Sequence, residues 1–415
     1  MGFNFPNTPT IGDLYPTPAL PGVPQYRWDG AVWTTTTYDP LTWVQRAGDT
    51  MTGALNVVTP PTLPAHAASK AYVDAAAVAA APFADAMAYS GMQINGSMDI
   101  SQELSGASIP ISGNSSKYVV DGWTFQTSGP QTITCGQAAA SGLSGFTSAL
   151  QASATVASVA VAVGDYAIYT HSIEGVRVAR LGWGAVNAKP ITIAFWVSAN
   201  RQGNYSGSIM NGVSNRSYPF SFTINAANTY EYKVVTIPGD TTGTWLKDSS
   251  KGMQVVVAMA VGTNYQGPAG VWSAGLFLGA TGTVNGIAAT SDVMRITGVV
   301  VLPGIYAPTA AQSPLIMRPY DQELMTCQRY YQKMDTPIIY QGYAAGAGAV
   351  VYGTMPYKVP MRSGPTITFP GATYFNASAL AVYAVPQLTH FAFQYTISAA
   401  GAGFFNSGFI MDARL

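Results

Sequence analysis

Beyond residue 91, apolar and polar residues alternate in short runs along the chain. Residues 191–198 combine this alternation with a nearly continuous apolar run, which is typical of a strand in the centre of a sheet. Clusters of Gly, Asn and Pro separate most of the runs and indicate turns. Many short strands with frequent turns predict an antiparallel sandwich. The expected strands are residues 118–120, 123–126, 153–163, 166–173, 191–198, 218–224, 230–237, 253–261, 271–278 and 293–301.

Two segments carry helical periodicity instead. Residues 69–81 are rich in Ala, with Ser69 as the expected N-cap and Pro82 as the residue that ends the helix. Residues 320–333 repeat apolar positions at helical spacing. We expect the apolar face of this second helix to close one end of the sandwich through Leu324, Cys327 and Tyr331.

Residues 1–46 have a different character, because prolines recur throughout their first half. These prolines exclude a long helix and favour extended chain bound to a partner. They are Pro6, Pro9, Pro16, Pro18, Pro21 and Pro24. Further along, Asp29 and Gly30 lie between aromatic-bearing segments, which predicts a hairpin with a type I′ turn. Trp28 and Trp33 would flank that turn.

The composition excludes several classes of function. Charged residues make up 9% of the 415 residues, and the 19 Lys and Arg balance the 19 Asp and Glu, so no field attracts nucleic acid or an anionic membrane. No run approaches the roughly 20 apolar residues that span a bilayer, and the N-terminus lacks the order of a signal peptide. We expect Cys135 and Cys327 to be two buried thiols, because a disulfide framework needs more cysteines.

Catalytic and metal-binding motifs are also missing from the sequence, so we expect no enzyme, metal or cofactor. The histidines are far apart in sequence and are expected to be surface or hydrogen-bonded core residues; they are His66, His171 and His390. A glycosidase needs two carboxylates roughly 5 to 10 Å apart. Turn-rich chain separates the candidate pairs, which are Asp165 with Glu174 and Asp240 with Asp248.

Sugar binding suits this composition better, because sugars stack on aromatic rings and pair with polar side chains. Aromatic residues with a polar group suit sites where one side stays wet. The candidate ligand-binding residues are Arg201, Asn204, Tyr205, Trp245, Tyr265, Trp272, Tyr374 and Tyr383. For each of the aromatic candidates the alternative is packing in the core or between subunits. Trp123 and Trp196 are assigned to the core.

Residues 47–74 form one unit with a Gly-bounded turn, an alternating strand at 51–58, a proline-rich bend and the start of a helix. A single strand and a single helix bury too little surface to be stable alone. The unit resembles one that recurs in bacteriophage tail fibres, with the pattern Gly-Asp-x-Met-Thr-Gly-x-Leu followed by Ala-x-x-Lys-x-Tyr-Val-Asp. The matching residues are Gly48, Asp49, Met51, Thr52, Gly53, Leu55, Pro64, Ala67, Lys70, Tyr72, Val73 and Asp74.

The rest of the chain is similar to a receptor-binding architecture of phage fibre proteins. The matching segments are residues 92–102, 118–123, 191–198, 319–331, 360–366 and 412–415. Residues 319–331 match the signature Tyr-x-x-Glu-Leu-x-x-Cys-Gln-Arg-Tyr-Tyr almost completely. The resemblance implies a jelly-roll, carbohydrate-module-like sandwich and a small trimeric β domain. It also implies structural roles at a domain junction for Glu323, Cys327, Arg329 and Tyr330, with Glu323 and Arg329 in ion pairs or hydrogen bonds.

Together these patterns predict a mainly β protein with four parts. These are an extended N-terminal adaptor (1–46), a short helix-containing trimeric stem (47–90), the sandwich (91–333) and a C-terminal β tip domain (334–415). The expected function is a non-catalytic, homotrimeric tail fibre in the extracellular virion. The adaptor would bind a tail or baseplate protein, and the sandwich and tip would bind host polysaccharide or lipopolysaccharide. The alternatives are a purely structural virion fibre and a tailspike depolymerase.

The trimeric stem makes a prediction about mass. Light scattering after gel filtration should give the mass of three chains for the full-length protein, because the stem is stable only when several chains wind together. A monomer would contradict the fibre interpretation.

Overall fold

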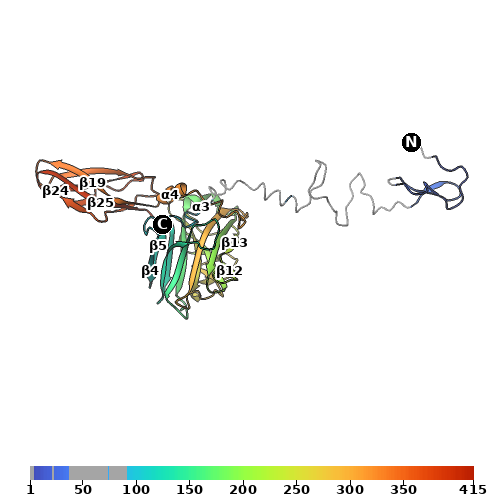
Figure 1. Cartoon of the computed structure of the whole chain (residues 1–415), viewed down its shortest axis with the longest axis horizontal. Coiled ribbons are helices and arrows are strands. Elements are labelled where there is room, and N and C mark those ends of the chain that lie inside the picture. The colour runs from blue at the N-terminus through green and yellow to red at the C-terminus, as the bar shows by residue number, and fades with distance from the viewer. Residues whose placement is uncertain (1–3, 21–22, 37–72, 74–90) are drawn as a thin grey trace. The chain divides into compact units, whose positions relative to one another are not determined.

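The computed structural model describes residues 4–20, 23–36, 73 and 91–415. The expected stem strand at 51–58 and, except for Val73, the expected helix at 69–81 lie outside these residues. The chain divides into two compact units, Met1–Ala81 and Pro82–Leu415 (Figure 1). The described part is mainly β, as predicted.

The described residues of the first unit form a small antiparallel sheet. Its strands, in spatial order, are β1 (Leu14–Tyr15), β2 (Tyr26–Trp28) and β3 (Trp33–Thr35). The hairpin is confirmed, with Trp28 opposite Trp33 and 5.7 Å between their ring centroids. The type I′ turn is wrong, because four residues separate Trp28 from Trp33 in place of two. Binding of this part to a partner stays a prediction. Gly30 has a φ of +107°, but Asp29 does not have the positive φ that a type I′ turn requires at both central residues. The Asp29 carboxylate instead accepts hydrogen bonds from the backbone N–H groups of Ala31 and Val32.

The second unit contains a sandwich of two antiparallel sheets, which confirms the predicted jelly-roll-like fold (Figure 1). The six-stranded sheet runs in the order β13 (Glu231–Ile237), β10 (Ile191–Ala199), β18 (Val293–Pro303), β8 (Ser148–Val156), β7 (Thr132–Ala139) and β4 (Ser108–Ser112). β10, expected in the centre of a sheet, pairs with a strand on each side.

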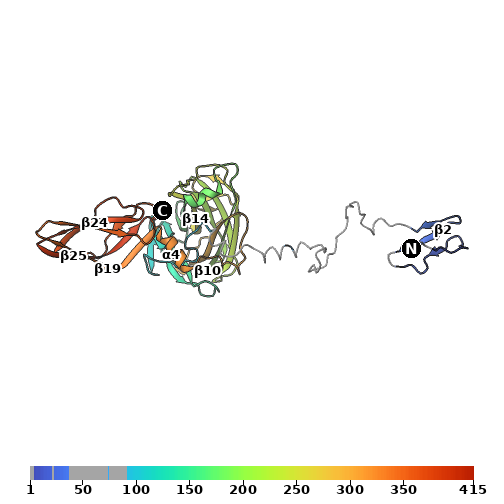
Figure 2. The same cartoon turned by 90° about the horizontal axis from the view of Figure 1, so that it is seen from above.

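The opposing sheet has seven strands. Its order is β16 (Ser273–Ala274), β12 (Arg216–Ile224), β11 (Gly203–Asn211), β14 (Lys251–Val261), β9 (Tyr166–Glu174), β6 (Trp123–Ser128) and β5 (Ser115–Val120). Two further short strands, β15 (Gln266–Gly267) and β17 (Gly279–Ala280), pair in parallel. Figure 2 shows β14 and β10 in the sandwich.

Alternate residues of both sheets point inward and form one large core. Trp123, Phe125, Tyr169 and Phe195 are fully buried there, and the Trp123 indole N–H donates to the Ile94 carbonyl at 3.2 Å. Burying side chains of this size is the main stabilising contribution to such a fold. The assignment of Trp123 to the core is therefore confirmed.

Two strand predictions and one core assignment are wrong. The strand expected at 153–163 is β8, which begins at Ser148 and ends at Val156. Residues 271–278 contain only the two-residue β16, which ends before Gly275, a residue with a φ of +122°. Residues 203–211, for which no strand was predicted, form β11, an interior strand that contains two Gly and two Ser residues. Trp196 is half-buried on the outer face of its sheet, where its indole N–H donates to the Ser313 hydroxyl at 2.8 Å.

The predicted second helix is α4 (Tyr320–Gln328), which ends earlier than expected because β19 (Tyr331–Ala344) begins three residues later. The helix buries Glu323, Cys327 and Gln328, whereas Leu324 is only half-buried. Its buried face is thus mainly polar, and the expected apolar face is wrong in composition. Short helices α3 (Gly175–Val178), η1 (Ala179–Leu181) and η2 (Thr263–Tyr265) complete the helical elements of the described residues.

Glu323 and Arg329 both form ion pairs at this junction, as expected, but with other residues and not with each other. Arg318 pairs with Glu323 at 3.1 Å, and Glu323 also accepts the Asn95 backbone N–H at 2.8 Å. Arg329 pairs with Glu174 at 2.7 Å, and the Tyr330 hydroxyl donates to the same carboxylate. Cys327 is a buried free thiol, as is Cys135.

The C-terminal residues build a second β structure with its own core. One sheet contains β19, β25 (Gly401–Asp412), β21 (Thr366–Thr368) and β22 (Thr373–Phe375). The other has the order β20 (Val350–Pro356), β24 (His390–Ile397) and β23 (Ala377–Val382). Buried aromatic rings, including Phe391, Phe393, Phe405 and Phe409, form the core of this tip.

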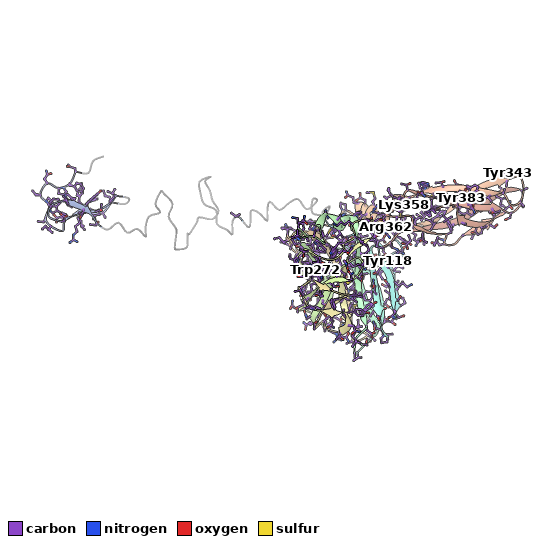
Figure 3. All side chains as sticks on the ribbon, turned by 180° about the vertical axis from the view of Figure 1, so that it is seen from behind. Tyr118, Trp272, Tyr343, Lys358, Arg362 and Tyr383 are labelled. Atoms are coloured by element: carbon purple, nitrogen blue, oxygen red, sulfur yellow. The ribbon has the colours of Figure 1, made fainter. Side chains whose placement is uncertain are left out.

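Residues near the C-terminus join the tip to the sandwich. The Arg414 guanidinium lies between the rings of Tyr118 and Tyr331, at 4.0 and 4.3 Å from their centroids. The Tyr118 hydroxyl donates to the Leu415 carbonyl at 2.7 Å, and Arg362 donates to the Ser249 carbonyl at 2.7 Å. Figure 3 labels Tyr118 and Arg362, which lie close to this junction.

A glycine in β11 tests the packing of the sandwich. A Cβ on Gly207 would lie 2.3 Å from the Val256 carbonyl oxygen and 2.5 Å from the Phe220 ring, whereas a Cβ on Gly164 would meet nothing within 4 Å. Gly207→Ala should therefore lower the free energy of unfolding by about 1–3 kcal/mol. Gly164→Ala should change it by no more than about 0.5 kcal/mol. Urea unfolding followed by tryptophan fluorescence checks both, and equal midpoints would contradict the packing described.

Candidate functional site

A groove of about 250 Å³ lies on the outer face of the seven-stranded sheet. Its floor comes from β6, β9, β11 and β14, and one wall comes from residues 265–278. The lining residues are Gln126, Tyr166, Ile168, Thr170, Met210, Ser214, Lys251, Gln254, Tyr265, Leu276 and Leu278. The groove therefore combines an apolar floor with amide, hydroxyl and ammonium groups.

The period of two in β9 determines which side chains reach the groove. Tyr166, Ile168 and Thr170 face outward, while Tyr169 and His171 are buried in the core. In β14 the register shifts between Lys251 and Met253. Such a bulge changes the face that a side chain occupies, which explains why residues 251 and 254 both line the groove despite their odd spacing.

One end of the groove is aromatic. The rings of Tyr166 and Tyr265 meet edge to face with 5.5 Å between centroids, and Leu278 packs against the same cluster. Burial, with a smaller contribution from Tyr265, raises the pKa of Tyr166. The hydroxyl therefore stays protonated at neutral pH and can both donate and accept hydrogen bonds. This end offers apolar ring surface beside a hydroxyl group.

The middle of the groove is polar and incompletely hydrogen-bonded. The Thr170 side chain is 3% exposed, and its hydroxyl oxygen has no hydrogen-bond partner in the structure. A buried hydroxyl without a partner costs free energy, so such a group calls for an explanation. Nearby, the Gln126 amide donates to the Thr124 hydroxyl, and the Gln254 carbonyl oxygen accepts from Ser214. The unpaired hydroxyl thus lies beneath the amide groups of Gln126 and Gln254, which line the groove and can bind a hydroxylated ligand.

Among the residues predicted to bind a ligand, only Tyr265 lines this groove. Tyr205 and Trp245 are 1% and 5% exposed, so their rings belong to the core and they are withdrawn as ligand contacts. Trp272 is half-buried, packs against Trp245 at 5.6 Å and donates to the Pro238 carbonyl. The alternative of core packing holds for Tyr205 and Trp245.

The remaining predicted residues lie apart from the groove lining. Arg201 forms a bidentate ion pair with Asp292, and Asn204 is exposed on β11. Tyr374 and Tyr383 are 43% and 56% exposed on the tip. Figure 3 shows Tyr383 and Tyr343 on the tip and Trp272 on the sandwich.

Sequence reasoning missed Tyr166, Thr170, Lys251 and Gln254. The available signal was the strand at 166–173, since its alternate residues include the polar Thr170 on the face opposite the core. Which neighbouring strands supply Lys251 and Gln254 depends on sheet order, and sheet order is not visible in the sequence.

A larger hollow of about 670 Å³ lies beside α4, lined by residues that include Arg177, Arg318 and Arg329. Two of these arginines already have carboxylate partners, Glu323 and Glu174. Asp321 also lines the hollow, so its lining carries charges of both signs.

One of the three histidines lies in the core and is held there by hydrogen bonds. His171 is buried, stacks on Trp123 and accepts the Ile94 N–H, while its other nitrogen donates to the Gly122 carbonyl at 2.7 Å. Burial lowers the pKa of His171 to about 4.

No group of three metal-binding side chains occurs among the described residues. None of the helices within that part is long and apolar enough to span a membrane.

One carboxylate of each pair considered for catalysis is bound by an arginine. Asp240 forms a bidentate pair with Arg216, and Glu174 is bound by Arg329. These two carboxylates therefore form ion pairs.

No family model matches the sequence, and no curated protein matches it. Several solved structures share part of the fold. The enzymatically active domain of tailspike protein 4 of bacteriophage CBA120 is 13% identical with a TM-score of 0.27, over 52% of this chain. The chain covers only 22% of that domain.

Two carbohydrate-binding modules also resemble the chain over part of its length. The family 11 module of Clostridium thermocellum, in complex with a mixed-linked tetrasaccharide, is 12% identical over 48% of this chain and 99% of its own, with a TM-score of 0.24. A family 4 module is 11% identical over 44% of this chain and 94% of its own, with a TM-score of 0.22.

The unpaired hydroxyl in the groove gives a stability prediction. Thr170→Val should raise the free energy of unfolding by about 1 kcal/mol, because a methyl group replaces an unsatisfied buried hydroxyl. The matched control is Thr127→Val, since Thr127 is equally buried but its hydroxyl donates to the Gly113 carbonyl at 2.8 Å. That control should lower the free energy by about 1 kcal/mol. Equal losses in urea unfolding would show that Thr170 is hydrogen-bonded in solution.

Proposed function

We propose that this protein binds an oligosaccharide in the groove of the seven-stranded sheet without cleaving it. The observation that carries the proposal is the Tyr166–Tyr265 pair on a groove surface that also presents amide groups. A sugar offers apolar C–H surface to the rings and hydroxyls to the polar groups. Sites of this kind combine apolar lining with a few placed polar groups.

The absence of catalysis is part of the proposal, and the chemistry of the groove supports it. Glycoside hydrolysis uses a pair of carboxyl groups that flank the scissile bond. The groove lining, as far as the structure describes it, contains no Asp or Glu. Binding without bond cleavage is what such a lining supports.

We further propose that the chain is a homotrimeric tail fibre protein of a phage, which uses this binding to adsorb to host polysaccharide or lipopolysaccharide. The support is the two sets of motifs in the sequence, the stem unit at 47–74 and the signature at 319–331. The adaptor would attach to a tail or baseplate protein. Three grooves on one trimer would raise the avidity about 10² to 10⁴ times if they engage together.

A structural virion fibre is the second candidate, and the surface of the tip favours it. Tyr352 and Tyr383 form an exposed edge-to-face pair with 4.6 Å between centroids, and Phe375 stacks on Phe404 at 5.2 Å. Exposed aromatic surface of this kind also suits contact between protein subunits.

Binding of the full-length protein to an oligosaccharide array separates the candidates. The wild type should bind. Tyr166→Ala should weaken binding about tenfold or more, because the aromatic surface on which a sugar ring packs is lost. Tyr383→Ala, on the tip, is the matched control and should bind like the wild type. Loss of binding only in the tip variant would move the site to the tip. No binding by any variant would favour the structural fibre, and new reducing ends would favour the depolymerase.

A further inference from the structure

The groove holds a positive charge without a partner. Lys251 is half-buried at the start of β14 and lines the groove. No ion pair joins it to a carboxylate in the part of the chain that the structure describes. Burial is the cause that lowers the pKa of Lys251. A partly desolvated ammonium without a counter-charge is unfavourable, so its retention on a ligand-facing surface calls for an explanation.

The acidic residue opposite Lys251 in the sheet already has hydrogen-bond partners. Glu174 lies directly opposite Lys251 in the register of β9 and β14. Its carboxylate, however, accepts two bonds from Arg329 and one from the Tyr330 hydroxyl. Glu174 is also only 1% exposed. Its charge is therefore already paired, which leaves Lys251 uncompensated.

Lys251 lies at one end of the groove, and the aromatic residues lie at the other end. Tyr166 pairs with Val261 at one end of β9 and β14, Thr170 pairs with Val256 in the middle, and Lys251 lies opposite Glu174 at the other end. Thr170 and residue 174 are four residues apart, which is about 13 Å along a strand. A ligand that reaches both Thr170 and Lys251 is therefore longer than one sugar ring.

Resting on the proposed function, we infer that the ligand of the groove is an acidic oligosaccharide, oriented with an anionic group at Lys251 and neutral sugar units toward Tyr166 and Tyr265. The anionic group is a carboxylate or a phosphate, since an ammonium pairs with either. Gln254, beside Lys251 in the groove, adds an amide that can donate to the same anion. Neutral rings pack on the tyrosines.

The test is an array of oligosaccharides in matched pairs, read with the full-length protein. Each uronic-acid oligosaccharide stands beside its carboxyl-reduced form, and phosphorylated oligosaccharides form a third group. Wild type should bind the acidic members at least tenfold more tightly than the reduced ones. Lys251→Gln should remove that preference, whereas Lys251→Arg should keep most of it. The control is Lys247→Gln, which removes an exposed charge outside the groove and should change nothing.

The outcomes distinguish this inference from the proposed function. Preference for uronates alone or for phosphates alone, abolished by Lys251→Gln, supports the inference and identifies the anion. Equal binding of acidic and reduced members, unchanged in Lys251→Gln, overturns it while the groove remains a glycan site. A preference that Lys247→Gln removes as strongly as Lys251→Gln also overturns it. Absence of binding to every oligosaccharide overturns the proposed function and this inference together.

Discussion

Packing of alternate β9 residues between the two sheets is the constraint on which the groove depends. Tyr169 and His171 are locked in the core by neighbouring rings and backbone groups, so residues on the opposite face have no freedom to turn inward. Tyr166 and Thr170 are held outward as a consequence. A ligand site built on such a strand is rigid before the ligand arrives, which reduces the entropy lost on binding.

Two residues of the groove lower the stability of the fold, whereas the core raises it. Thr170 keeps a hydroxyl without a partner, and Lys251 keeps an ammonium that is partly removed from water. Each feature is unfavourable for folding alone. The large apolar core offsets these costs.

The same strand links the groove to the junction with the tip. Glu174 ends β9 and binds Arg329 and Tyr330, which lead from α4 into β19. Arg414 then inserts its guanidinium between Tyr118 and Tyr331. These contacts use buried charges and rings together, so the sandwich and tip are joined by oriented polar contacts in addition to apolar packing.

Alternation in the sequence was enough to determine the strands that pack the core, including β9, β10 and β14, and the class of fold. It did not show β11, because Gly and Ser residues carry no apolar pattern, and Gly207 is explained only by the neighbouring Phe220 ring. The buried positions of Tyr205 and Trp245 were likewise hidden. Tertiary structure decided the groove, since strand order brings residues 166, 170, 251 and 254 together and a bulge turns Lys251 to their side. Such neighbours are set by pairing between distant segments, which a local pattern does not record.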